Sequence, residues 1–406
     1  MSAVRPGLVA LLLSAACLTD AEAAETQLLP KGVFILDVSY LDTSLDAQYS
    51  NDGQRESLLP AQERYEPGGG LQGMLTARPD VRFQLAVTQL MYGATDDLTL
   101  ALIMPVVLKT RVTTNLGWES GDYQPQLGRA YTEEDFWAWA GSMGQPKPPD
   151  QWEGNQFAPS DMVLGARYRV PRFAFLEKTG ILAAVGLQVA LPTGRPPLRE
   201  EVIGVGTTTW DLHSYGDVEV HAAASRSLWT DRAGVDRLHL TGDFFYSFFR
   251  PRRLETPRGE VNPLLLSYAP YVGDSYVLDP GDWLGSNFTL EAALWDGPTA
   301  RGLIHKTRPK ADGTLPPLVS LVLSYSHIRT FQSDWRSESP LWDWDREKYW
   351  RPGYKNILRA TANVSLLRVG LPLQLYASAR DQRILRGKNV RPADVLTFGG
   401  RLFARF

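Results

Sequence analysis

The side chains that most often carry catalysis are few in this sequence, and their spacing fits no reaction centre. The five histidines stand far apart, without the short spacing that metal ligands share. His213 and Ser214 are neighbours, but adjacent residues of a strand point to opposite faces, so they make a poor base–nucleophile pair. Gly204 and Gly206 precede no helix that would cradle a phosphate. We therefore expect neither an enzyme nor a cofactor.

Aromatic side chains gather in two segments, 113–159 and 331–353, which hold eight of the twelve tryptophans. Thr132, followed by three acids, is typical of an N-cap and predicts a short helix from Glu133 to about Met143. Two interpretations are open: a capture surface or plug above a lumen, or a girdle at a membrane interface that packs against lipopolysaccharide. The candidate capture residues are Trp118, Phe136, Trp137, Trp139, Trp152, Trp335, Trp342, Trp344 and Trp350.

Charged residues recur on one face of segments whose polarity alternates. On what we expect to be inward faces stand Arg82, Arg167, Arg169, Asp217, Glu219, Asp243, Glu291, Arg359, Arg380, Arg401 and Arg405. They either line an aqueous path or form a satisfied network of ion pairs with no part in selectivity. His221 and His239 are expected to face the same interior and to form hydrogen bonds there. The net charge of −3 argues against a nucleic-acid partner.

The first residues are typical of a cleaved signal peptide. Arg5 supplies the positive charge, Leu8–Leu18 is a short apolar core, and small residues favour cleavage after Ala23, with Ala24 as the alternative. We therefore divide the chain into a signal peptide, 1–23, and a mature domain, 24–406. Cys17 is the only cysteine, and Ser14 stands where a lipoprotein signal usually carries Leu. The mature protein is then expected to contain no thiol.

The elements that position these groups follow a period of two. At the C-terminus, Leu396, Phe398, Leu402 and Phe406 share one face, while Arg401 and Arg405 lie on the other. Such segments run to ten or more residues, whereas strands of soluble sandwiches or propellers, the alternative, usually have five or six. No later stretch approaches the apolar length of a membrane helix, but a barrel strand meets lipid only with every second residue. The pattern predicts an all-β, up-and-down antiparallel transmembrane β-barrel.

We expect about twelve strands, near 33–43, 81–93, 97–112, 160–171, 179–192, 215–229, 235–249, 283–295, 317–330, 354–368, 371–383 and 394–406. Their connections alternate between long and short, as external loops and periplasmic turns do. The connection near 296–316 should be short and is not. A missed hairpin there would make fourteen strands.

Three short motifs resemble one family of transporters. Asp161–Tyr168 resembles the recurrent D-x-x-L-G-x-R-Y strand of the "MetA-pathway of phenol degradation" family, and Leu191–Gly194 resembles its L-P-T-G strand end. The turn at Thr95–Leu98, which leads to Met104-Pro105, is similar to that family's second hairpin. The resemblance covers roughly residues 80 to 230. It implies an outer-membrane barrel distantly like the long-chain fatty-acid channels, and uptake of hydrophobic or aromatic compounds.

We therefore expect a channel in the outer membrane of a Gram-negative bacterium that passively admits small hydrophobic or aromatic compounds to the periplasm. Its expected partners are outer-membrane lipid and lipopolysaccharide, the barrel-assembly machinery, which would read Phe406, and a small hydrophobic solute. A surface-structural or interaction barrel without transport is the alternative, and a lipid-modifying enzyme of the outer membrane is the third interpretation.

Overall fold

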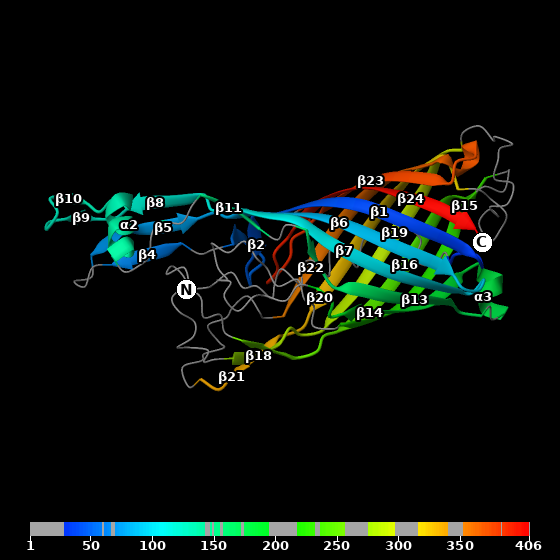
Figure 1. The fold of residues 1–406 in the computed structure, drawn as a ribbon, viewed down its shortest axis with the longest axis horizontal. Coiled ribbons are helices and arrows are strands. Elements are labelled where there is room, and N and C mark those ends of the chain that lie inside the picture. Colours follow the sequence, from blue (N-terminus) through cyan, green and yellow to red (C-terminus); the bar gives the residue numbers. More distant parts are fainter. Residues whose placement is uncertain are drawn as a thin grey trace.

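A computed structural model gives the fold of the chain (Figure 1). It describes residues 28–58, 61–65, 70–142, 147, 150–154, 157–171, 174–194, 217–231, 236–255, 275–296, 316–339, 352–382 and 384–405. The expected signal peptide, its cleavage site and Cys17 lie outside these ranges, as does Phe406. Within them, no helix is both long and apolar enough to cross a membrane.

Twelve antiparallel strands form a closed barrel, which fills the right half of Figure 1. They are β1 (Val33–Leu45), β6 (Asp80–Gly93), β7 (Leu98–Thr113), β13 (Met162–Arg169), β14 (Leu182–Leu191), β15 (Val218–Thr230), β16 (Asp236–Phe248), β19 (Trp283–Trp295), β20 (Val319–Thr330), β22 (Gly353–Ser365), β23 (Leu373–Asp381) and β24 (Asp394–Arg405). Each strand pairs with its neighbour in the chain, and the first pairs with the last, from Val33 opposite Arg405 to Ser44 opposite Asp394. The barrel has no free edge.

The prediction of twelve strands is confirmed, and each lies within a few residues of its expected range. β19 pairs directly with β20, so the long connection between them adds no strand to the wall. The two further strands of the sheet, β11 (Gln151–Gly154) and β12 (Ala158–Pro159), pair with β7 outside the ring.

Long and short connections lie at opposite ends of the barrel. At the short-turn end are the helix α3 (Ala174–Thr179), the 3-10 turn η3 (Leu366–Val369) and the end of β24, next to the C-terminus in Figure 1. At the long-loop end are the hairpin of β2 (Ala47–Tyr49) and β3 (Arg55–Ser57), and the small sheet of β17 (Arg252–Glu255), β18 (Ser275–Asp279) and β21 (Asp334–Ser337). This is the arrangement of an up-and-down barrel.

The two faces of the wall differ in polarity. Large apolar side chains are exposed on the outer face, among them Val220, Phe244, Phe288, Leu323, Leu375 and Phe398. Residues of the opposite phase are buried in the interior and are mostly polar, for example Asp243, Asn287, Ser324 and Thr397. An outer face of this kind suits contact with acyl chains.

Strand β6 reverses this rule and corrects one expectation. Val81, Phe83, Leu85 and Val87 are buried in the interior, and the alternate residue Arg82 lies on the outer face, paired with Asp80 at 3.3 Å. Arg82 is therefore not an inward-facing charge. The reason is that this end of β6 packs against apolar residues of β1 and β7 inside the barrel. Which of its two alternating sets of side chains faces inward is therefore clear only from the neighbouring strands.

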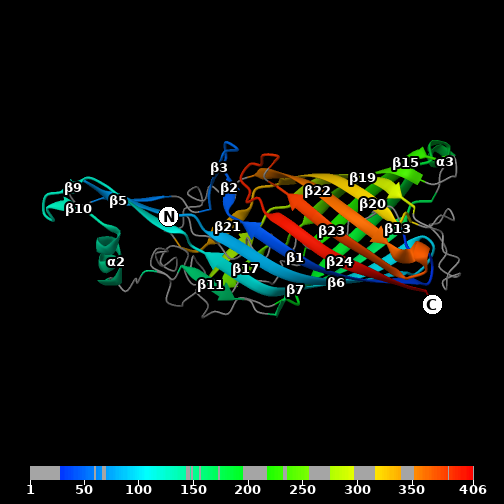
Figure 2. The same cartoon turned by 90° about the horizontal axis from the view of Figure 1, so that it is seen from above.

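A slender arm projects from the long-loop end, on the left of Figures 1 and 2. It consists of the sheet β4 (Gln62–Tyr65), β5 (Leu71–Ala77) and β8 (Leu116–Ser120), the pair β9 (Tyr123–Gln124) and β10 (Arg129–Ala130), and the helix α2 (Glu133–Ser142). The segments before β6 and after β7 thus pair with each other beyond the wall.

The alternation predicts how neighbouring positions in β23 tolerate a charge. Ala377 faces outward in the middle of the strand and Ser378 faces inward, opposite Thr361 and Thr397. We expect Ala377→Lys to lower the free energy of unfolding in lipid vesicles by about 2–4 kcal/mol, because the ammonium group would face hydrocarbon. The matched variant Ser378→Lys should cost less than half as much. Equal losses in a denaturant titration would contradict the assignment of faces.

Candidate functional site

The barrel interior contains a buried cluster of acids around one histidine. His221 lies between two carboxylates: its Nε2 is 2.8 Å from Glu219 Oε1 and its Nδ1 is 3.0 Å from Asp243 Oδ2. The strand register explains the arrangement, because Glu219 and His221 alternate on β15 and Asp243 faces inward on β16. The geometry suits an imidazole ring with a proton on each nitrogen. Asp217 immediately precedes the same strand and is also buried.

Neighbouring polar groups extend this acid–histidine cluster, which we define as Asp217, Glu219, His221 and Asp243. The Gln188 amide is 3.2 Å from His221 Nε2, and the Ser247 hydroxyl donates a hydrogen bond to Glu219 rather than to histidine. The histidines of the described ranges, His221, His239 and His327, contact acids, amides or aromatic rings, and none bonds a serine. The described residues therefore contain no serine–histidine pair for a hydrolase.

Basic side chains face the interior from the other side of the barrel. Lys355 and Arg359 lie on the same, inward-facing side of β22, and Arg380 lies opposite Arg359 on β23. Lys355 is buried, and its Nζ lies 4.6 Å from the centre of the Trp283 ring. The interior thus carries acids mainly on β15 and β16, and bases on β13, β22, β23 and β24.

The seam between the first and last strands has its own ion pair. Arg401 Nε donates to Asp37 Oδ2 at 2.6 Å, and the Tyr376 hydroxyl donates to Asp37 Oδ1 at 2.8 Å. The Arg401 guanidinium also lies over the Tyr376 ring, 4.7 Å from its centre. The Asp37 carboxylate is therefore fully engaged, and three strands are linked inside the barrel.

The register places most of the expected lumen charges inside the barrel. Facing inward on a strand, or in the inward phase directly before one, are Arg167, Arg169, Asp217, Glu219, Asp243, Glu291, Arg359, Arg380, Arg401 and Arg405. Arg169 reaches Asp97 of the short turn before β7 at 3.7 Å. His221 and His239 face inward and form hydrogen bonds, as expected, and only Arg82 lies on the outer face.

An apolar cluster fills the interior at the long-loop end. Its members come from β1, β6, β7, β12, β13, β14 and β24 and from two loops. They are Leu41, Leu45, Leu58, Val81, Phe83, Leu85, Val87, Ile103, Val107, Val112, Ala158, Val163, Ala190, Ala393 and Val395, which we call the interior apolar cluster. Several of these side chains are completely buried, so they pack against one another at this level.

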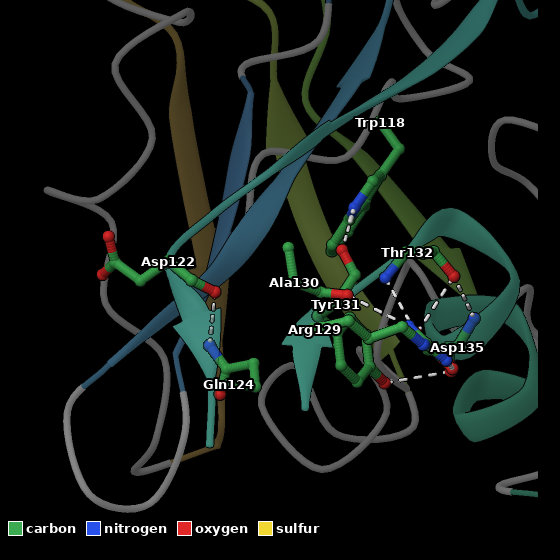
Figure 3. Close-up of polar contacts among 8 residues, drawn as sticks. All are labelled: Trp118, Asp122, Gln124, Arg129, Ala130, Tyr131, Thr132 and Asp135. Atoms are coloured by element: carbon green, nitrogen blue, oxygen red, sulfur yellow. Dashed lines mark hydrogen bonds and ion pairs between the residues drawn. The ribbon is translucent and has the colours of Figure 1, made fainter. Parts of the chain in front are cut away.

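The aromatic residues of segment 113–159 form a small core in the arm. Trp118 stacks on Phe136 with ring centres 5.1 Å apart, and Phe136 meets Trp137 edge-on at 4.7 Å. The guanidinium of Arg64 lies 3.3 Å from the centre of the Trp139 ring. Trp118 also donates its indole N–H to the carbonyl of Tyr131 at 3.1 Å (Figure 3). Three of the candidate capture residues thus pack together, and Trp139 remains partly exposed.

Helix α2 begins as predicted, with Thr132 as its N-cap. Asp135, three residues later, accepts hydrogen bonds from the Thr132 amide at 2.8 Å and hydroxyl at 3.0 Å (Figure 3). The Arg129 guanidinium donates two hydrogen bonds to the same carboxylate, from Nη1 to Oδ2 and from Nη2 to Oδ1, the latter at 2.8 Å. These hydrogen bonds, first from Arg129 and then from Thr132, hold the pKa of Asp135 well below its usual range. The carboxylate thereby connects the β9–β10 turn to the helix.

The side chains of the other capture candidates lie outside the described part of the chain. Trp342, Trp344 and Trp350 lie outside the described residues. Trp152 belongs to β11 and Trp335 to β21, where only their backbone is described.

Sequence reasoning missed Gln188, Asn287, Lys355 and Arg64. Asn287 and Lys355 stand in the inward phase of their strands, four residues from Glu291 and Arg359, so period-two counting could have found them. Gln188 faces inward on a strand without a noted charge, and its place beside His221 follows only from the register. Arg64 gave no such signal, because its contact depends on a sheet between distant segments. Across the described ranges, no three His, Cys, Asp or Glu side chains gather in a metal-binding arrangement.

The cap of α2 predicts the stability of the arm. We expect Asp135→Asn to make the arm more sensitive to limited proteolysis while the barrel stays intact on a gel, because the N-cap and the Arg129 pair are both weakened. Glu134→Gln, in the same helical turn, is the matched control and should leave cleavage unchanged. Because the pKa of Asp135 is lowered on folding, its contribution is present above its unfolded pKa of about 4 and is lost only as pH falls through the folded value. Wild-type resistance that vanished already at pH 5 would contradict this assignment.

Comparison with known proteins identifies the fold. No family model matches the chain, and no curated protein matches its sequence. It is similar to the crystal structure of an outer-membrane channel from Pseudomonas putida F1, with a TM-score of 0.54 and 12% identity, over 94% of this chain and 99% of that one. The translocator domain of the autotransporter NalP from Neisseria meningitidis (TM-score 0.44, 10% identity, 99% and 98% covered) is less similar. So is the toluene transporter TbuX from Ralstonia pickettii (TM-score 0.34, 8% identity, 95% and 92% covered).

Identities this low show the fold alone, and the two lower TM-scores carry no argument. The twelve-stranded ring, its outward apolar face and its alternating connections agree with that fold. The chain is therefore an outer-membrane β-barrel of the kind found in Gram-negative bacteria, as the resemblance in its sequence implied.

Proposed function

We propose that the barrel is a channel that passively admits small hydrophobic or aromatic compounds to the periplasm. The observation that supports this most directly is the interior apolar cluster at the long-loop end, which is the external end of such a barrel. A water-filled porin carries polar groups throughout its interior. Here the long-loop end of the interior contains Phe83, Leu85 and Val107, which offer apolar contacts to a solute arriving from outside.

The size of the barrel fits small solutes. Twelve strands enclose a narrow interior, which long side chains fill to a large extent. The polar half beyond the apolar cluster is also occupied by hydrogen-bonded groups, such as the Asp37–Arg401 pair. Passage by diffusion down a gradient then requires only that a small apolar molecule exchange contacts with this cluster.

The arm is proposed as a low-affinity collector above the channel. Trp139 is partly exposed on α2, and Tyr65 and Tyr123 expose more than half of their side chains nearby. Aromatic rings bind apolar solutes through a large contact area at a low cost in side-chain entropy. Lipopolysaccharide contact and recognition of the C-terminal strand by the assembly machinery belong to the same proposal.

One observation favours a second function, an interaction barrel without transport. The core of the arm is largely closed on itself, because Trp118, Phe136 and Trp137 pack against Leu75 and Tyr131. A folded extension of this kind presents a fixed surface to another macromolecule. Transport measurements separate the two functions.

The channel function predicts the effect of a hydroxyl in the apolar cluster. We expect the double variant Val87→Thr/Val107→Thr to slow uptake of labelled toluene by cells of a deletion strain about tenfold, because two hydroxyls without partners disfavour an apolar solute. Val38→Thr makes the same change on the outer face and should leave uptake unchanged. If the wild-type chain does not raise toluene uptake above that of the deletion strain, the channel proposal is wrong.

The collector role predicts a concentration dependence. Trp137→Ala/Trp139→Ala should reduce uptake at low toluene concentration and leave the maximal rate unchanged, because the arm raises the local solute concentration only. Trp295→Ala, an exposed tryptophan at the short-turn end of the barrel wall, is the matched control. Identical uptake by both variants at every concentration would discard the collector.

A further inference from the structure

The acid–histidine cluster holds more carboxyl groups than its histidine can pair. Asp217, Glu219 and Asp243 are 3%, 7% and 0% exposed, and a single imidazole lies between two of them. Asp217 is therefore a third buried carboxyl group with no contact to the ring, and Asp161, also buried, lies close enough to act on it electrostatically. Leaving a buried carboxyl oxygen without a partner is costly.

The same region contains buried oxygen atoms that accept no hydrogen bond. Among the described residues these include Asp217 Oδ1, Asp243 Oδ1 and Asn287 Oδ1. Asn287 is 4% exposed and lies directly opposite Asp243, so these two oxygens come from neighbouring inward positions of one patch of wall. All three are acceptors. Buried acceptors are nearly always paired in folded proteins, so a set of three indicates that a donor belongs here.

No side chain of the described ranges supplies that donor. Two bases come near the cluster: Arg167, across Gly186 from His221, and Lys355, within electrostatic range of Glu219. The Lys355 Nζ, however, lies over the Trp283 ring, and within the part of the chain that the structure describes this lysine forms no ion pair. Arg380 faces inward from β23 and lies within electrostatic range of Lys355.

We propose that this patch binds the primary ammonium group of an amphiphilic amine, whose apolar body contacts the interior apolar cluster. An ammonium group has three donors and no acceptor, which matches a set of acceptors without donors. The Phe245 ring lies 5.7 Å from the His221 ring and adds an aromatic face beside the acids. A metal ion fits less well, because no metal-binding arrangement of acids and histidines occurs within the described residues. The proposal rests on the channel function and names a solute class for it.

The test is a binding measurement on the purified, full-length barrel in detergent micelles, by isothermal titration calorimetry at constant pH and salt. Benzylammonium and benzyl alcohol are the probes, because they differ mainly in the charged group. We expect the wild type to bind benzylammonium about tenfold more tightly or better, since charge-assisted hydrogen bonds replace neutral ones. Asp217→Asn and Glu219→Gln should each remove this preference and leave benzyl alcohol binding unchanged.

Glu291→Gln is the matched control, because it removes an inward-facing carboxylate of β19 outside the cluster. It should keep the preference, and heat-modifiable migration on a gel verifies that each variant is folded. Equal affinity of the wild type for the two probes, or a preference that survives both cluster variants, overturns the ammonium site and leaves the channel proposal standing. Displacement of benzylammonium by an equal concentration of sodium would also overturn it, as a site for inorganic counter-ions. Binding of neither probe contradicts both proposals.

Discussion

The structure depends on one constraint: the backbone hydrogen bonds of the wall must form an unbroken ring. Inside a bilayer there is no water to pair with a free strand edge, so β1 must meet β24 although more than three hundred residues separate them. The contacts at this seam are correspondingly dense. Arg401 and Tyr376 both bond Asp37 inside the barrel, so that the last two strands are joined to the first by side chains as well as by the backbone. Both termini of the wall, the short turns and the direction of every strand follow from closing this ring.

Because the ring fixes which way each residue points, the fold was largely readable from the sequence. Side chains that alternate between lipid and interior produce a period of two, and the ten or more residues needed to cross make the pattern long enough to recognise. Residues of β24 and β16 show it most clearly, for example Phe398 against Thr397 and Phe244 against Asp243. Where the interior is itself apolar, the pattern does not show which set of alternating residues faces inward. On β6 the apolar phase faces inward and Arg82 faces outward, and counting alone cannot distinguish the two phases.

The arm shows a different limit of sequence reasoning. Its helix was predictable because an N-cap is local: Thr132 and Asp135 satisfy each other within one turn. The surroundings of the helix were not, because Arg64 and Leu75 come from a segment that precedes β6 and meets the rest only after β5 pairs with β8. The sequence therefore shows only that aromatic residues are concentrated in this segment. Their partners, and their position beyond the barrel wall, follow from the pairing of β5 with β8.

Buried carboxyl groups of the interior are fully hydrogen-bonded at the seam but not at β15 and β16. At the seam, Asp37 has a guanidinium and a hydroxyl as partners, so a buried carboxylate in this barrel can be fully paired by its neighbours. At β15 and β16 the carboxyl groups outnumber the one imidazole between them, and Asp217 Oδ1 and Asp243 Oδ1 accept no hydrogen bond. A sealed structural core would gain by pairing these oxygens, since an unsatisfied buried acceptor is costly. Their open acceptor positions therefore fit an interior that binds a guest.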